Sequence, residues 1–170
     1  MKNLLKLSLV TLFLLAVTST YAQKFGHIDT QQLVQIMPSM KKAQTSLEAY
    51  AKELQEVQGQ LEKELQAKWV EYSQKKDSLS EIKLKALEAD IQNLQQRMQT
   101  NGQVSQQNMQ KKQAELMKPI IDKMRATIEA VAKEKGLIYV FDVQPGTPII
   151  YKSNESIDLL PLVKQKLGIQ

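Results

Sequence analysis

The chain has 170 residues, one histidine, no cysteine and a formal net charge of +5, and only 5% of its residues are aromatic. The lack of cysteine excludes a disulfide framework and a thiol nucleophile. The charge does not gather into the dense Lys/Arg cluster of a nucleic-acid-binding face, so we expect no nucleic-acid partner. Few aromatic residues and few glycines are typical of long helices rather than of a compact globule.

Residues 1–22 have the pattern of a cleavable secretory signal peptide. Two lysines precede an apolar run at 7–17, and Thr20 and Ala22 place small residues before a cleavage point. That run is shorter than the ~20 residues that span a bilayer, so we expect no stable membrane insertion after cleavage. An uncleaved membrane anchor is the alternative. Cleavage before Gln23 would lower the net charge to +3, because both lysines leave with the signal.

The first segment after the signal predicts a short strand followed by a short helix. Residues 24–29 read as the strand, and Asp29 with Gln32 has the spacing of a capping box at a helix start. The helix is expected to end before Pro38, because a proline disfavours helical backbone at the residue before it.

A long helix is predicted from residue 39 to residue 76, because this stretch has no proline and its apolar residues follow a heptad seam. Toward its end the spacing changes to four, four and three residues, a stutter that locally unwinds a supercoil. The seam comprises Met40, Ala43, Leu47, Tyr50, Leu54, Val57, Leu61, Leu65, Trp69 and Tyr72.

Residues 77–80 interrupt this seam, and Ser78 with Glu81 has the spacing of a capping box that starts a new helix. A second seam then follows at Leu84, Leu87, Ile91, Leu94 and Met98. Residues 39–76 and 81–118, up to Pro119, are equally long, which predicts two helices of ~57 Å that form an antiparallel hairpin. Asn101-Gly102 is the rival turn, and it would leave one arm nearly twice as long as the other.

The C-terminal part predicts strands. After a helical stripe that ends at Gly136, residues 137–143 are almost all apolar and read as a strand covered on both faces. Pro145-Gly146 suits a type II turn, and 148–152 reads as the partner strand of a β-hairpin. Asp158 is expected to cap a last helix that has Pro161 in its first turn, runs through Leu167 and stops at Gly168.

These elements predict a mainly α protein with a small β body, in which a long antiparallel coiled-coil hairpin is carried on a small sheet. The domains are a signal peptide (1–22), a body (23–37 and 119–170) and a hairpin arm (38–118) with its tip near 77–80. So small a sheet buries little surface alone, so we expect several chains to associate through its strands. The candidate oligomerisation residues are Phe25, Ile28, Leu137, Val140, Phe141 and Val143.

From residue 23 to residue 170 the order of elements resembles the OmpH/Skp family of periplasmic chaperones. The closest pieces are Gly26-His27-Ile28-Asp29 and the closing strand that ends in Asp142. The resemblance implies a homotrimer with a β-barrel body, whose arms enclose a cavity that holds unfolded outer-membrane proteins in the periplasm without ATP. The well-known members are strongly basic, whereas this chain is not, so no lipopolysaccharide site is carried over.

No catalytic, cofactor-binding or metal-binding residue is expected, and we predict that the protein is not an enzyme. His27 is the only histidine, and in a strand it is expected to be a packed side chain. A non-catalytic structural coiled-coil adaptor of the cell envelope remains the alternative function.

The two arms are unequally apolar near the body. In the hairpin register residue i faces about residue 157 − i, so 99–115, which is poor in apolar residues, lies beside 42–58, which is rich in them. We expect part of the stripe to be available to clients, with methionines adding adaptable contacts. The alternative is that the stripe packs on the aliphatic stems of Gln and Lys. The candidate client-contact residues are Leu47, Tyr50, Leu54, Val57, Met109 and Met117.

Overall fold

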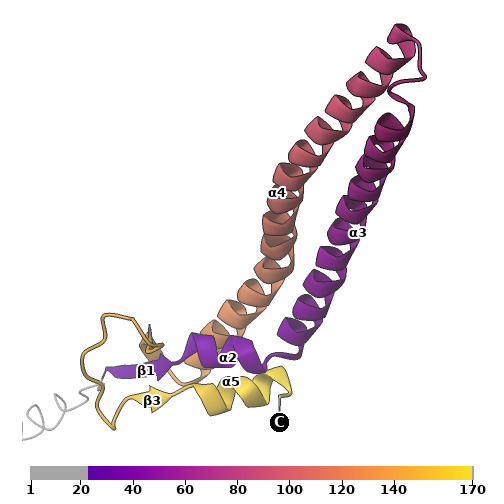
Figure 1. Cartoon of the computed structure of the whole chain (residues 1–170). Coiled ribbons are helices and arrows are strands. Elements are labelled where there is room, and N and C mark those ends of the chain that lie inside the picture. Colours follow the sequence, from indigo (N-terminus) through magenta and orange to yellow (C-terminus); the bar gives the residue numbers. More distant parts are fainter. Residues whose placement is uncertain (1–22, 170) are drawn as a thin grey trace, which may run out of the picture. The chain divides into compact units, whose positions relative to one another are not determined.

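A computed structural model describes residues 23–169, so the predicted signal peptide lies outside the described residues (Figure 1). The chain forms two compact units. We call residues 23–31 and 127–168 the sheet unit, and residues 32–126 the arm unit. The elements in chain order are β1 (Lys24–Ile28), α2 (Thr30–Ile36), α3 (Pro38–Lys75), α4 (Glu81–Glu134), β2 (Leu137–Asp142), β3 (Ile157–Asp158) and α5 (Leu160–Leu167).

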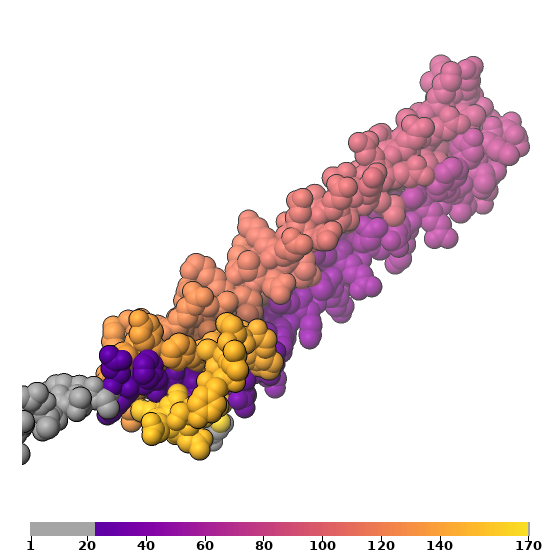
Figure 2. All heavy atoms as spheres, turned by 90° about the vertical axis from the view of Figure 1, so that its left-hand side faces the viewer, coloured from indigo at the N-terminus to yellow at the C-terminus, as the bar shows by residue number. Residues whose placement is uncertain are grey.

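In the arm unit, α3 and α4 run antiparallel and are joined by a turn at residues 76–80 (Figure 1). The predicted hairpin and its tip are therefore confirmed, and the rival turn at Asn101-Gly102 is excluded because both residues lie inside α4. In the space-filling view, α3 and α4 run alongside each other along the length of the arm (Figure 2).

Polar pairs cross between the arms along much of their length. Lys68 forms an ion pair with Asp90 at 2.9 Å, and the Tyr72 hydroxyl donates to Glu88 at 3.1 Å. Nearer the start of α3, Lys112 lies 5.7 Å from the centre of the Tyr50 ring. The residue numbers of these pairs add up to 158 to 162, a little above the expected 157, so the predicted register is nearly right.

The predicted capping box at the tip is wrong. The Ser78 hydroxyl donates back to the carbonyl of Lys75 at 3.1 Å, where it helps to end α3. The new helix begins at Glu81, directly after Ser80, whose carbonyl accepts from the amide of Leu84 at 2.9 Å. Ser78 therefore lies too early in the chain to cap α4, because an N-cap residue immediately precedes the first helical residue.

The expected end of the arm helix at Pro119 is also wrong. α4 continues through Pro119 as one helix of 54 residues, whereas α3 has 38 residues. An interior proline costs about 3 kcal/mol, because one backbone hydrogen bond is lost and its ring crowds the preceding turn. Burial of the helical stripe that follows, which includes Ile120, Met124 and Val131, offsets this cost.

The sheet unit contains a parallel three-stranded sheet in which β1 is central and β2 and β3 flank it. The predicted hairpin between 137–143 and 148–152 is therefore wrong, because 148–152 has no regular structure and β3 follows it at Ile157. Parallel strands cannot be joined by a tight turn. The stretch from 143 to 156, which we call the crossover segment, connects β2 to β3 around the central strand.

One face of this sheet packs against Leu159, the residue that directly precedes α5. A Cβ atom at Gly26 would lie 2.4 Å from the Leu159 side chain and 2.6 Å from that of Leu137, so only glycine fits there without rearrangement. The Asp158 carboxylate accepts from the amide of Leu160 at 2.9 Å at the start of α5, as predicted, although the N-cap position itself is held by Leu159. The helix ends at Gly168 in the left-handed conformation, also as predicted.

Candidate functional site

Three aromatic side chains form an exposed triangular cluster across β1 and β2. Phe25 lies 6.4 Å from Tyr139 and 6.1 Å from Phe141, measured between ring centres, and the last two are 6.1 Å apart. They are 39%, 63% and 40% exposed. We call these three residues the aromatic face. Side chains alternate across a strand, so this face is opposite the side on which Gly26 meets Leu159.

The sequence-based view that β2 is covered on both faces is wrong for the single chain, because Ile138, Tyr139 and Phe141 are exposed. Among the predicted oligomerisation residues, Phe25 and Phe141 lie on the aromatic face. Ile28 is buried within the chain, and Leu137, Val140 and Val143 are half-buried.

The crossover segment adds further exposed apolar surface. Ile150 is fully exposed, Tyr151 is 82% exposed, and Ile149 is also exposed. Sequence reasoning missed all three as interaction candidates and assigned them to a strand. Their alternation of β-branched and aromatic residues does resemble a strand, but no neighbouring strand pairs with them in the described chain.

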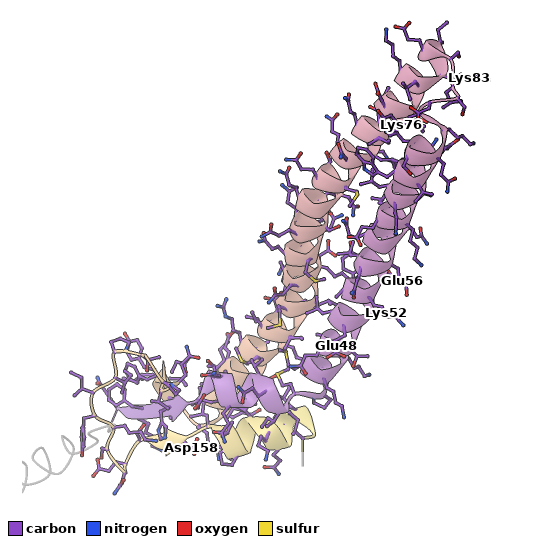
Figure 3. All side chains as sticks on the ribbon, viewed as in Figure 1. Glu48, Lys52, Glu56, Lys76, Lys83 and Asp158 are labelled. Atoms are coloured by element: carbon purple, nitrogen blue, oxygen red, sulfur yellow. The ribbon has the colours of Figure 1, made fainter. Side chains whose placement is uncertain are left out.

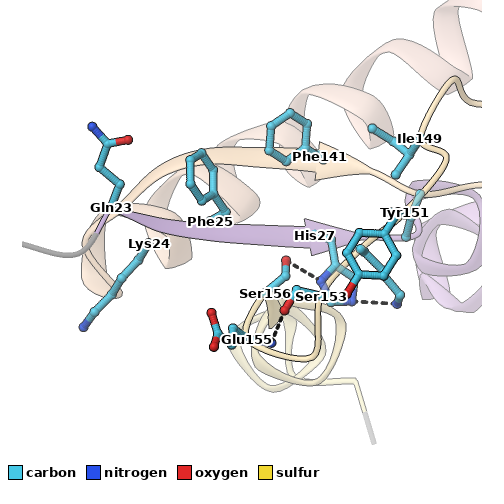
Figure 4. Close-up of a pocket in the computed structure, with 12 residues that line it drawn as sticks. Gln23, Lys24, Phe25, His27, Phe141, Ile149, Tyr151, Ser153, Glu155 and Ser156 are labelled. Carbon is cyan, nitrogen blue, oxygen red and sulfur yellow. Dashed lines mark hydrogen bonds between the residues drawn. The ribbon is translucent and has the colours of Figure 1, made fainter.

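The crossover segment and the sheet enclose a cavity of 480 Å³ beside the aromatic face (Figure 4). Phe25 and Phe141 line it from the sheet, and Ile149 and Tyr151 line it from the crossover segment. The polar part of its lining comes from Gln23, Lys24, His27, Lys152, Ser153, Glu155 and Ser156.

His27 connects the sheet to the crossover segment, and it is only 7% exposed, so its prediction as a packed side chain is confirmed. Its Nδ1 atom lies 2.9 Å from the Ser156 hydroxyl, and its Nε2 atom lies 2.8 Å from the Lys152 ammonium (Figure 4). Burial lowers the pKa of His27, the Lys152 charge lowers it further, and Asp158 acts in the opposite direction.

Asp142 is a second positioning residue, which sequence reasoning identified only as the end of a strand. One carboxylate oxygen accepts from the Thr30 hydroxyl at 2.5 Å, and the other accepts from the Thr30 amide at 3.2 Å. The same carboxylate accepts from the amide of Gln144 at 3.1 Å. Asp142 thus fixes both the start of α2 and the first turn of the crossover segment.

The arm seam divides into two stretches. Toward the tip, Leu61 of α3 and Leu87, Ile91 and Leu94 of α4 are buried, and we call these four the tip-side seam. Beyond Leu61, the α3 seam is half-buried at Leu65 and Tyr72 and exposed at Trp69. Toward the start of α3, Leu47, Tyr50 and Leu54 are half-buried and Val57 is exposed, and we call these four the base-side seam. The other predicted client-contact residues, Met109 and Met117, are half-buried.

Polar groups occupy the arm where the two stretches meet. The Asn101 side-chain amide donates to the Gln58 side chain at 3.0 Å across the arms. A groove of 760 Å³ opens at the same level, lined by Val57, Leu61 and Val104 together with Asn101 and Arg97. Its mixed lining suits weak and adaptable contacts better than tight binding of one ligand.

The outer faces of the arms carry charged side chains, and Figure 3 shows Lys52 and Glu56 along α3. The described residues contain no group of three or more His, Asp and Glu side chains placed to hold a metal ion. No helix among the described residues is long and apolar enough to cross a membrane.

A family model described as "Outer membrane protein (OmpH-like)" matches residues 24–167. A solved structure from Caulobacter crescentus CB15, described as an outer membrane chaperone (OmpH-like), has a similar fold with a TM-score of 0.74. The alignment covers 88% of this chain and 86% of that one at 13% sequence identity. None of the curated proteins matches the sequence.

Proposed function

The chain belongs to the OmpH-like family, and from this premise we propose that it is an ATP-independent holdase chaperone of the periplasm. Its clients are unfolded outer-membrane proteins, and three chains assemble through their sheet units. The arm units hold the client, so the binding surface is made of many weak contacts whose combined strength comes from multivalency. The predicted signal peptide supports the periplasmic location, and no catalytic step is part of the proposal.

The aromatic face carries the assembly part of this proposal. Phe25, Tyr139 and Phe141 are all more than a third exposed, and Ile150 and Tyr151 of the crossover segment add to the same unit. Contiguous exposed apolar surface of this kind marks an interaction site. The sheet also has two unpaired edges, at β2 and β3, and closed association of several copies removes such edges.

The base-side seam carries the client-holding part. Leu54 and its neighbours keep apolar surface accessible along α3, while the facing stretch of α4 is rich in glutamine. An unfolded β-barrel protein exposes alternating apolar side chains that have no fixed arrangement. A stripe of half-buried Leu, Tyr and Met side chains can contact such a chain without selecting one sequence.

The assembly is tested by measuring the mass of the intact mature protein and its ability to suppress aggregation of an unfolded β-barrel protein without nucleotide. We expect three chains and suppression. Tyr139→Lys should dissociate the assembly, because it places a charge on the aromatic face. Gln165→Lys adds the same charge at an exposed position of α5 and should leave three chains. A monomeric wild type without holdase activity would contradict the proposal.

Client contact is tested with a photo-crosslinking residue at position 54 and a matched control at position 52, which is exposed on the same helix (Figure 3). We expect client adducts from position 54 and few from position 52. Strong adducts from position 52 and none from position 54 would show that the base-side seam only packs on the facing Gln and Lys stems.

A further inference from the structure

The crossover segment is joined to the sheet by side chains on both sides of one imidazole. Ser156 contacts Nδ1 of His27 and Lys152 contacts Nε2, at 2.9 and 2.8 Å. The two contacts come from opposite ends of a short stretch of the segment, and the exposed Ile149, Ile150 and Tyr151 directly precede Lys152. The position of this apolar surface therefore depends on what His27 can accept and donate.

We propose that His27 is a pH-sensitive latch: its neutral ring holds the crossover segment against the sheet, and protonation releases the segment from Lys152. We further expect that this release weakens association of the chains, and this second step rests on the proposed function. The latch itself is a property of the single sheet unit and is tested independently of assembly.

The geometry permits only one protonation state of the ring to satisfy both contacts. The Lys152 ammonium has three hydrogens and no acceptor, so it must donate, and Nε2 must carry a lone pair to receive that bond. The proton of the neutral ring then lies on Nδ1 and is donated to the Ser156 hydroxyl. A second proton on Nε2 would replace this hydrogen bond by two positive charges at the same distance.

The surroundings of His27 are charged on several sides. Lys152 and Glu155 line the cavity from the crossover segment, and Lys24 lines it from β1. Asp158 is paired with His27 across β1 and β3, and its charge favours the protonated ring. β2 contributes Phe141, an apolar neighbour that raises the cost of burying a charge. Lys152 and burial together outweigh Asp158, which lowers the pKa of His27.

The direction of the pH dependence follows from that lowered pKa. In the released segment His27 titrates near its ordinary pKa of about 6.5. Above that pH the ring is neutral in both states, so the latch has its full strength. As the pH falls from about 6.5 through the lowered pKa, the released state takes up the proton first and the latch weakens. Below the lowered pKa, each unit by which the pKa of His27 is lowered reduces the equilibrium constant for holding the segment about tenfold.

His27 is the only histidine of the chain, so its ring signals give an unambiguous titration by NMR. We expect a midpoint below about 6.5 in the native protein and near 6.5 in denaturant. Lys152→Met keeps the aliphatic stem but removes the charge, and it should move the native midpoint upward. A native midpoint at or above 6.5, or no change in Lys152→Met, would overturn the latch.

Release is measured by hydrogen exchange of peptides from residues 144–156, corrected with the intrinsic rates of the unfolded peptide. We expect protection to fall between pH 7.5 and pH 5 in the wild type, because the lowered pKa of His27 favours the released segment as the ring becomes protonated. Gln in His27→Gln can still accept from Lys152 and donate to Ser156 but does not titrate, so its protection should stay constant. Equal losses in both proteins would contradict the proposal, and arm peptides serve as the internal reference.

The mass of the assembly separates this proposal from the proposed function. If three chains at pH 7.5 dissociate at pH 5 in the wild type but not in His27→Gln, both stand. A single chain at pH 7.5 would reject the proposed assembly, whereas the titration and exchange results would still decide the latch. Three chains that persist at pH 5, despite release of the segment, would reject the link between latch and assembly.

Discussion

The two stretches of the arm seam are built from the same heptad pattern but end in different states. In the tip-side seam the burial lies mainly on α4, where Leu87, Ile91 and Leu94 are buried. In the observed register these three residues face the apolar residues Leu65, Trp69 and Tyr72 of α3. The base-side seam offers equally apolar residues, yet α4 faces it with polar side chains, and its members remain half-buried or exposed. The difference shows that a heptad seam on one helix determines where a partner helix lies. The sequence of the partner helix then determines how deeply the seam side chains are buried.

Truncation of one leucine on each side should show this difference most strongly. Leu94→Ala should destabilise the arm by about 2–4 kcal/mol, because Leu94 is only 4% exposed and leaves a cavity. Leu54→Ala should cost less than about 1 kcal/mol, because its side chain already contacts water. Urea unfolding followed by circular dichroism measures both. Equal losses would mean that the two stretches are packed alike.

Replacing the polar pair between the two stretches with apolar residues should make the base-side seam more like the tip-side seam. Gln58→Leu combined with Asn101→Leu should stabilise the arm by about 1–2 kcal/mol, because a half-buried amide pair is exchanged for apolar contact. The same change should reduce client crosslinking from position 54. Gln58→Leu alone is the control, because it leaves the Asn101 amide without its partner. Unchanged crosslinking in the double variant would separate client binding from the polarity of the seam.

The smallest effect is expected at the arm glycines. Gly59 and Gly102 lie inside α3 and α4, and nothing lies within 4 Å of a Cβ atom added at either position. Gly102→Ala should therefore stabilise the arm by about 1 kcal/mol, through helix propensity alone. Gly26→Ala is the contrasting control and should destabilise the sheet unit, because its Cβ would collide with the Leu159 and Leu137 side chains. A loss in Gly102→Ala would reveal a close packing role for that glycine.

The arm could be predicted almost entirely from the sequence, because its structure follows from local spacing. The seam and the break at 77–80 gave the antiparallel pairing, and the register came within a few residues of the observed one. The predicted helix end at Pro119 was wrong because the sequence pattern shows only the local free-energy cost of a proline inside a helix. The burial of Ile120 and Met124, which offsets that cost, depends on packing that the local pattern does not contain.

The sheet unit could be predicted only in part, because its pairing is not local. The positions of β1, β2 and α5 were close to the observed ones, but the central place of β1 was not foreseen. Residues 148–152 have the composition of a strand, and composition cannot tell a strand from an exposed segment that waits for a partner. The His27 contacts were missed for the same reason, since Lys152 and Ser156 lie more than 120 positions away in sequence.

The central position of β1 has a consequence for the order of folding. This strand is the first described element of the chain, yet both of its neighbours come after the whole hairpin, at Leu137–Asp142 and Ile157–Asp158. Contacts between distant parts of a chain form slowly, because the intervening loop must first be closed. We therefore expect α3 and α4 to pair first, beginning at the tip, while β1 has not yet formed hydrogen bonds with β2 and β3. The sheet is expected to form last. A chain that emerges N-terminus first therefore cannot assemble with other copies through its sheet until its C-terminal residues have also emerged.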